Sequence, residues 1–237
     1  MALKKIETFL ALQSQATDVL EAVKENIGND RITDRDLDRI TVPSQGGLNW
    51  TVPTLEGEDS AKTLDGIIVH WTSPRAYWAT GLEVGGNSPP DCSSHDGRSE
   101  ERREGKECRS GYGNPGGECF GCPLNQWGSA EGGGGKACKE KRMLFLLRAT
   151  DLLPIVIQAP STSIQSVKKY LLRLASQGMP YWSVMTKLSL EKAQSSTGIA
   201  FSRIVPKSSG PVPEEQREKL AEYVAAIKPI IGYMVNT

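Results

Sequence analysis

The two ends of the chain carry apolar positions at helical spacing. Near the N-terminus the apolar positions are Ile6, Phe9, Leu10, Ala16, Val19, Leu20, Val23 and Ile27. Gly28-Asn29 then supplies a stop signal, so residues 1–30 are expected to hold an amphipathic helix. Near the other end, Pro213 followed by Glu214 and Glu215 places proline and two acids in a first helical turn. We assign residues 211–237 to a C-terminal helix.

Between these helices the pattern changes to short β-like runs separated by turns rich in Gly, Pro and Ser. The runs span residues 40–42, 48–52, 64–71, 143–147, 155–159, 182–190 and 199–205. A helix capped at Ser161-Thr162-Ser163 and reaching about Gln177 interrupts them. Many short strands with one helix between them are typical of a small barrel or sandwich and not of βαβ units. We expect a mainly β (α+β) core over residues 31–210 with flanking helices.

Residues 80–142 form an insertion of different composition. Gly, Ser, Pro and Glu are abundant there, aliphatic residues are scarce, and Gly132–Gly135 is a run of four glycines that we expect to be a flexible spacer. Such a segment has little apolar surface to bury. All five cysteines lie between positions 92 and 138, inside this insertion. We therefore expect bound metal, and not a hydrophobic core, to order it.

The cysteine spacing favours one structural zinc ion. Cys119-Phe-Gly-Cys122 is a knuckle that can supply two thiolates to a tetrahedral ion, and Cys92 and Cys138 can supply the other two. His95 and Cys108 are alternates for the outer ligands. Four thiolates leave no open coordination position, so the Zn²⁺ is expected to be structural. Free thiols, or a redox CxxC, are less favoured because the motif does not begin a helix after a strand.

Catalytic motifs are missing from the sequence. It contains no nucleophile elbow, P-loop or HExxH, and the glycine run is followed by Lys136-Ala137, without the Ser or Thr that a P-loop requires. Asp34, Asp36 and Asp38 lack the Gly and distal Glu of a calcium loop. We expect a protein that is not an enzyme.

The formal net charge of zero averages two opposite regions. Residues 1–66 hold 7 Lys and Arg against 12 Asp and Glu, a net charge of −5, whereas residues 132–210 hold 12 against 3, a net charge of +9. Aromatic residues lie beside many of these cations, and single-stranded nucleic acid needs both stacking faces and cations. The candidate contacts are Trp71, Arg75, Tyr77, Trp78, Trp127, Lys136, Lys139, Lys141, Arg142, Lys168, Lys169, Tyr181, Trp182, Lys187 and Arg203. For each aromatic residue, partial burial in the core is the competing interpretation.

The sequence also predicts a cytoplasmic protein without a membrane partner. No stretch approaches the roughly 18 to 20 apolar residues of a membrane span, and the N-terminus has no signal-peptide pattern. Clustered cysteines fit a reducing compartment, where metal thiolates are favoured over disulfides.

Four segments give the chain a family resemblance: Pro-Pro-Asp-Cys92-Ser-Ser, Cys119-Phe-Gly-Cys122-Pro-Leu-Asn-Gln-Trp-Gly-Ser, Gly-Lys-Ala-Cys138-Lys and Ala-Pro160-Ser-Thr-Ser. Over residues 40–205 it resembles zinc-containing, OB-fold single-stranded-DNA-binding proteins of bacteriophage type, similar in plan to the helix-destabilising protein of T-even phages. The resemblance implies an OB-like small barrel and zinc ligation by Cys92, Cys119, Cys122 and Cys138.

In function, the resemblance implies non-sequence-specific binding of single-stranded DNA in phage-type replication or recombination, in the cytoplasm of a bacterial host and together with replication or recombination proteins. Such proteins often end in an acidic tail that recruits partners, which residues 231–237 do not provide. We therefore expect a missing tail or a different mode of recruitment.

A second hypothesis needs no nucleic acid. A zinc-containing protein-interaction module, acting as an inhibitor or scaffold, would use the N-terminal helix as its docking surface, and the same helix could mediate self-association. A nuclease or recombinase is a third hypothesis, weakened by the lack of an acid cluster or activated nucleophile.

Overall fold

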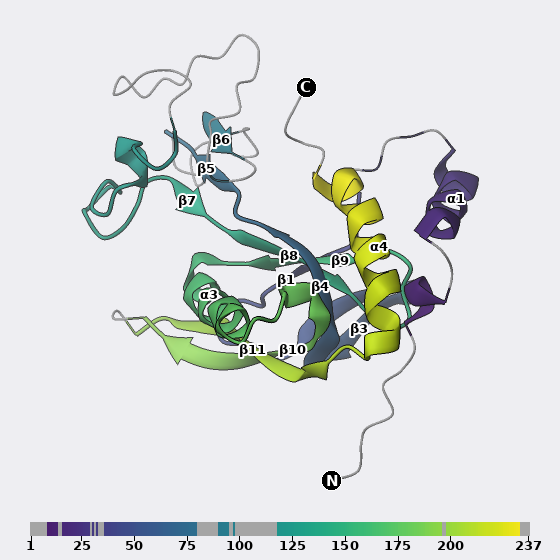
Figure 1. Ribbon diagram of the computed structural model, residues 1–237. Coiled ribbons are helices and arrows are strands. Elements are labelled where there is room, and N and C mark those ends of the chain that lie inside the picture. Colours follow the sequence, from purple (N-terminus) through teal and green to yellow (C-terminus); the bar gives the residue numbers. More distant parts are fainter. Residues whose placement is uncertain are drawn as a thin grey trace. The chain divides into compact units, whose positions relative to one another are not determined.

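The computed structural model describes residues 9–13, 16–28, 30, 32, 36–79, 90–94, 97, 118–195 and 198–232. The chain divides into two compact units (Figure 1), which are Met1–Trp71 with Leu144–Thr237, and Thr72–Met143. The described residues form a mixed α/β structure with a mostly β core and three α-helices. The predicted mainly β core with flanking helices is therefore confirmed.

The core is a six-stranded sheet in the order β1-β9-β8-β4-β10-β11. Its strands are β1 (Arg39–Thr41), β4 (Thr63–Thr72), β8 (Arg142–Leu147), β9 (Ile155–Ala159), β10 (Val184–Gln194) and β11 (Ala200–Pro211). β1 runs parallel to β9, whereas β10 runs antiparallel to both β4 and β11. The described strands form no closed barrel, so the OB-like barrel stays a prediction.

One face of the sheet packs against the helix α3 (Ser161–Ser176). Leu144, Leu188 and Ile204 join Val167 of α3 in a single buried cluster. The helix begins after Pro160, which makes no side-chain cap, so the predicted Ser/Thr cap is wrong. Ser163 lies inside the helix instead, and its hydroxyl accepts a hydrogen bond from the Ile204 amide at 3.0 Å. The serine that looked like a cap therefore ties α3 to β11.

The opposite face of the sheet is also covered. Phe145 and Leu147 alternate along β8 with the residues of the α3 cluster, yet both are fully buried. The 3-10 turn η1 (Leu10–Leu12) and the helix α4 (Glu214–Gly232) are both anchored to the connection between β8 and β9. The Leu10 amide donates to the Ala149 carbonyl at 2.9 Å, and the Tyr223 hydroxyl donates to the Leu152 carbonyl at 2.8 Å. Apolar residues of these two elements, among them Leu12 and Leu220, are buried as well.

The terminal helices differ in length from the prediction. The N-terminal region contains η1 and then α1 (Ala16–Ile27), which is shorter than the predicted helix, and residues 1–8, 14 and 15 lie outside the described part. The predicted C-terminal helix is confirmed as α4, with residues 233–237 again outside. None of the helices in the described ranges combines the length and apolar character that a membrane crossing needs.

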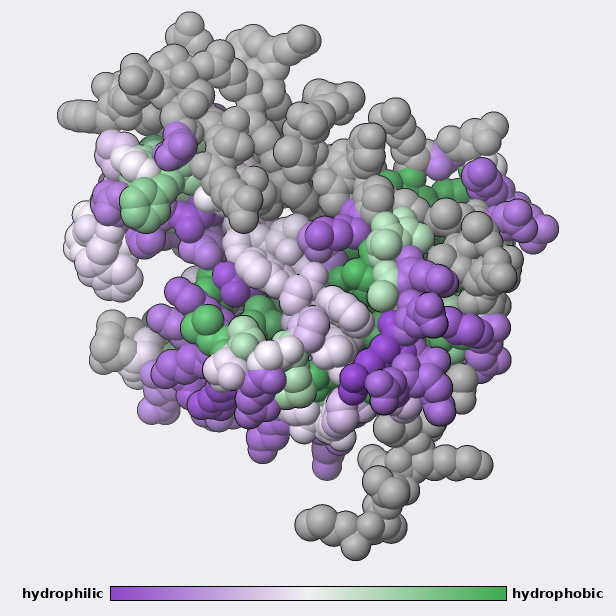
Figure 2. Space-filling view, in the orientation of Figure 1, coloured by the Kyte–Doolittle hydropathy of each residue, from purple (hydrophilic) through white to green (hydrophobic). Residues whose placement is uncertain are grey.

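Two smaller elements complete the first unit. The hairpin of β2 (Trp50–Thr54) and β3 (Gly57–Ala61) is a two-stranded sheet, and Trp50 is fully buried with its indole N–H donating to the Leu188 carbonyl at 3.3 Å. The 3-10 turn η3 (Tyr181–Ser183) precedes β10. Hydrophilic residues gather over α4 and over the β10–β11 hairpin on the face drawn in Figure 2.

The second unit has a three-stranded sheet of its own. Its order is β6-β5-β7, formed by β5 (Arg75–Tyr77), β6 (Cys92–Ser94) and β7 (Lys139–Glu140). The 3-10 turn η2 (Pro123–Asn125) follows the CxxC pair directly. Four of the five cysteines fall in the described part of this unit. The unit therefore contains the predicted metal-ligand region almost in full.

Candidate functional site

The short sheet places Cys92 and the residue after Cys138 on the two strands that flank β5. Cys92 of β6 pairs with Tyr77 on one side of β5, and Lys139 of β7 pairs with Ala76 on the other side. Cys138 directly precedes β7. Two cysteines that are 46 positions apart in the sequence thus lie in or next to strands that pair with β5.

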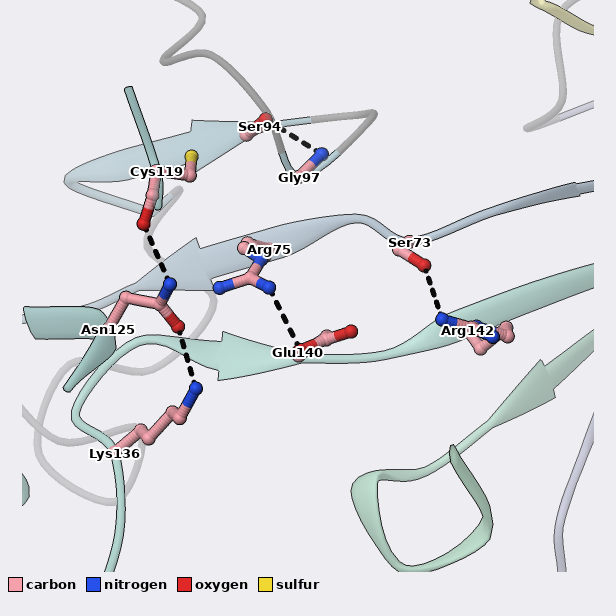
Figure 3. Close-up of polar contacts among 9 residues, drawn as sticks. All are labelled: Ser73, Arg75, Ser94, Gly97, Cys119, Asn125, Lys136, Glu140 and Arg142. Carbon is pink, nitrogen blue, oxygen red and sulfur yellow. Dashed lines mark hydrogen bonds and ion pairs between the residues drawn. The ribbon is translucent and has the colours of Figure 1, made fainter. Parts of the chain in front are cut away.

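Hydrogen bonds join the CxxC loop to residues 136–138. The Cys138 amide donates to the Leu124 carbonyl at 2.9 Å. The Asn125 side chain donates to the Cys119 carbonyl at 2.7 Å and accepts from the Lys136 ammonium at 3.1 Å (Figure 3). Asn125 is buried, so these two bonds satisfy polar groups that burial would otherwise penalise. The loop therefore has a defined shape around the cysteines.

The Cys138 thiol is part-buried and responds to several charged groups. Burial raises the pKa of the Cys138 thiol to about 11, from an ordinary value of 9.0. The Arg75 guanidinium lowers that pKa, whereas the thiols of Cys119 and Cys122 raise it further. The convergence of these three cysteines on one metal ion stays a prediction.

Arg75 is an unusual cation beside these thiols. Its Nη2 donates to Glu140 Oε2 at 3.0 Å, and its side chain is only 16% exposed. Its Nε and Nη1 are buried and have no hydrogen-bond partner among the described residues. Gly97 packs directly against it, since a Cβ on Gly97 would lie 3.1 Å from Arg75 Nε and 2.6 Å from the Ser73 carbonyl oxygen. Two donors of a cation that lowers the pKa of Cys138 are thus held in a tight space, and within the described ranges they have no acceptor.

The predicted glycine spacer has a defined structure. Gly132 and Gly133 have φ angles of 81° and 73°, which side chains rarely adopt. The Gly133 amide donates to the Ala130 carbonyl at 2.8 Å, and the Gly128 amide donates to the Gly135 carbonyl at 2.8 Å. The glycines and their neighbours therefore form a hydrogen-bonded turn, and the flexibility of this spacer stays a prediction. This turn leads the chain from the CxxC pair to Cys138.

The metal itself is not tested by this arrangement. Among the residues that the structure describes, no three His, Cys, Asp or Glu side chains form a group that could hold an ion as they stand. The alternates His95 and Cys108 lie outside the described residues. Zinc ligation by Cys92, Cys119, Cys122 and Cys138 therefore stays a prediction.

Several predicted nucleic-acid contacts are engaged within the protein. Trp71 and Tyr181 pack against the α3 cluster and are part-buried. Arg142 is 8% exposed and donates to the Ser73 hydroxyl at 3.0 Å, so it offers little surface to a phosphate. Two cations of the β10–β11 hairpin are in ion pairs. Lys187 Nζ lies 3.4 Å from Asp65 Oδ1, and Arg203 Nη2 lies 2.5 Å from Glu191 Oε1.

The other predicted contacts keep exposed surface. Trp127, Lys139 and Lys141 are exposed in the second unit, and Lys168 and Lys169 are exposed on α3. Those of intermediate exposure are Tyr77, Trp78, Lys136 and Trp182. The structure does not test whether any of them contacts DNA.

Phe120 was missed by the reasoning from sequence, although it is 89% exposed. The signal was present, because Phe120 follows Cys119 inside the knuckle. If both cysteines of a CxxC pair turn toward one centre, the residue after the first is directed outward.

Comparisons with protein-family models, with curated proteins and with solved structures found no match to this chain. Its function must therefore be argued from its own residues and strand order.

Proposed function

We propose that this protein binds single-stranded DNA without sequence specificity, in phage-type replication or recombination. It would do so with an OB-like core whose inserted unit is stabilised by a structural zinc ion. The observation that carries the proposal is the order of the strands in the core sheet.

The connectivity supports an OB-like core. In the OB fold the first strand pairs with the second and the fourth, and a helix commonly joins the third to the fourth. Here β4 lies between β8 and β10, and α3 joins β9 to β10. Strands β4, β8, β9, β10 and β11 correspond in chain order to the five OB strands. This sheet differs from a closed OB barrel at the edge of β9. There β1 pairs with β9 in parallel, at the place that β11 would take in a closed barrel.

This correspondence gives the inserted unit a functional meaning. OB proteins contact oligonucleotides with the face of their second and third strands and with the loops joining strands one to two and four to five. Residues 73–141 are the first of these connections, and residues 195–199 are the second. By fold-level analogy, these two connections are where contacts to an oligonucleotide are expected.

The usual strand face is not free in this protein. Phe145 and Leu147 of β8 and Val156 of β9 point away from the α3 cluster and are fully buried. Because η1 and α4 are anchored beside them, a strand of DNA would not reach this face without displacing buried apolar surface. The connections between strands must then make the main contacts.

The residues of the second unit fit a zinc ion by the chemistry of their donors. Cys92, Cys119, Cys122 and Cys138 would hold it, and the ion would stabilise the fold of a segment with little apolar core. Four thiolates and one Zn²⁺ carry a net charge of −2, and buried charge needs a partner. Arg75 provides a cation with two donors that lack acceptors in the described structure, and thiolate sulfurs would accept from them.

The proposal is tested by binding and by metal content. Fluorescence anisotropy with a labelled oligonucleotide should show tighter binding to single-stranded than to duplex DNA. The logarithm of the binding constant should fall by about 0.7 per log unit of salt for each phosphate contacted. Elemental analysis should find one zinc ion per chain. Absence of binding at low salt, or preference for duplex, would refute DNA binding, and folded, metal-free protein that still binds DNA would refute the zinc.

A further inference from the structure

Two aromatic side chains of the cysteine loop are presented to solvent. Phe120 is 89% exposed and Trp127 is 78% exposed. Large apolar side chains are normally buried at least in part, and aromatic ones offer the most area to lose from water. Two in one short loop therefore call for a ligand that uses aromatic faces.

The backbone beneath these side chains is held in place. Gln126 donates from Nε2 to the Phe120 carbonyl at 3.3 Å, and Ser129 donates from Oγ to the Gln126 carbonyl at 2.7 Å. On the other side of Phe120, the Cys119 carbonyl accepts from Asn125. The residues flanking each aromatic are thus hydrogen-bonded within one loop. A ligand that stacks on them would not have to order the backbone first.

Positive charge is tied to the same loop. The Lys136 ammonium is hydrogen-bonded to Asn125, which in turn holds Cys119 next to Phe120 (Figure 3). The Lys139 ammonium donates to the Lys136 carbonyl at 2.8 Å, and Lys141 is exposed. The one acid among residues 136–142, Glu140, is paired with Arg75. A negatively charged ligand is therefore favoured over a neutral one.

We propose that Phe120 and Trp127 form a stacking platform for the bases of a single strand, and that Lys136, Lys139 and Lys141 bind the phosphates of its backbone. This inference rests on the proposed function and names the residues that perform it. Aromatic faces next to cations match the needs of single-stranded nucleic acid, since every base has a π-face whatever its sequence. A protein partner would not require the cations.

The test uses full-length, zinc-loaded protein and a labelled oligo(dT). Removing one stacked base contact by alanine substitution typically weakens binding by about 5- to 150-fold. We expect Phe120→Ala and Trp127→Ala each to weaken binding by at least about fivefold, without changing the salt slope, because neither side chain contacts a phosphate. Leu55→Ala is the matched control, since Leu55 is apolar, fully exposed and lies in the β2–β3 turn. It should bind like the wild type.

Leucine variants separate stacking from general apolar contact. Phe120→Leu and Trp127→Leu keep an apolar side chain but lose the ring, so we expect them to bind nearly as weakly as the alanine variants. If an alanine variant loses zinc, the leucine variants test the role of the ring instead, because they keep an apolar side chain at the same position. Leucine variants with wild-type affinity would overturn the proposal, as would alanine variants that match Leu55→Ala.

Two further outcomes are distinct. If the variants change only the oligomeric state in sedimentation and leave the DNA affinity unchanged, the pair is a contact between copies of the chain, and the stacking proposal is overturned. If the wild-type protein binds no single strand at all, the proposed function itself fails.

Discussion

The ion pair of Arg75 and Glu140 gives a prediction in which removing the cation weakens zinc binding and removing the anion does not. Arg75→Met removes the cation and keeps an unbranched apolar stem. With zinc bound, the guanidinium offsets the charge of the thiolates and can donate to them from Nε and Nη1. Losing such an outer partner typically weakens metal binding 10- to 100-fold, or about 1.4 to 2.8 kcal/mol.

The structure sets the expected size within that range. The Arg75 side chain is 16% exposed and part of its charge is already paired with Glu140, so solvent and the ion pair both moderate its effect. We expect a loss of about tenfold in zinc affinity. Glu140→Gln removes an anion that disfavours the Cys138 thiolate, because Glu140 raises the pKa of that thiol. Its zinc affinity should equal or exceed that of the wild type.

The assay is competition for zinc with a chromophoric chelator at neutral pH, with the cobalt form used to confirm tetrahedral thiolate coordination from its spectrum. Lys141→Met is the matched control, because Lys141 is an exposed cation next to Glu140 in the sequence and should change the affinity little. The reasoning is refuted if Arg75→Met binds zinc as tightly as the wild type, or if Arg75→Met and Glu140→Gln both weaken binding to the same extent.

Three other predictions concern stability. Cys122→Ser, or treatment with a strong chelator, should make residues 72–143 sensitive to protease while residues 144–237 stay resistant. The reason is that the α3 cluster lies wholly in the unit formed by residues 1–71 and 144–237. Equal cleavage of both units would contradict this prediction. Tyr170→Phe should lower the free energy of unfolding in urea by about 1 to 2 kcal/mol, since it removes the 2.8 Å hydrogen bond to the fully buried Thr186 hydroxyl. Adding Thr186→Val should restore most of the loss, and failure to do so would count against this cause. Gly66→Ala should lower the free energy of unfolding by about 1 to 3 kcal/mol or more, because its Cβ would lie 2.4 Å from the Leu147 carbonyl oxygen; a variant as stable as the wild type in urea would contradict it.

The sequence by itself determined the class of the core and the position of its insertion. Alternation and turn residues placed strands at 64–71, 143–147 and 155–159, and the structure has them at Thr63–Thr72, Arg142–Leu147 and Ile155–Ala159. These predictions succeed because the period of side-chain burial is a local property of the backbone. The clustering of cysteines in a segment with few aliphatic residues was equally visible, whereas their convergence on one metal ion stays a prediction.

Only the tertiary structure decided the order of the strands and which polar or aromatic residues face solvent. Nothing local predicts that β4 lies between β8 and β10, because the pairing of β4 with β10 alone joins residues more than a hundred positions apart. Arg142 and Trp71 looked like surface contacts in sequence, yet Arg142 is buried and Trp71 packs on the core, whereas Phe120 is almost fully exposed. Residue type gives only a tendency toward burial. Whether a side chain is buried depends on residues from distant parts of the chain that do or do not cover it.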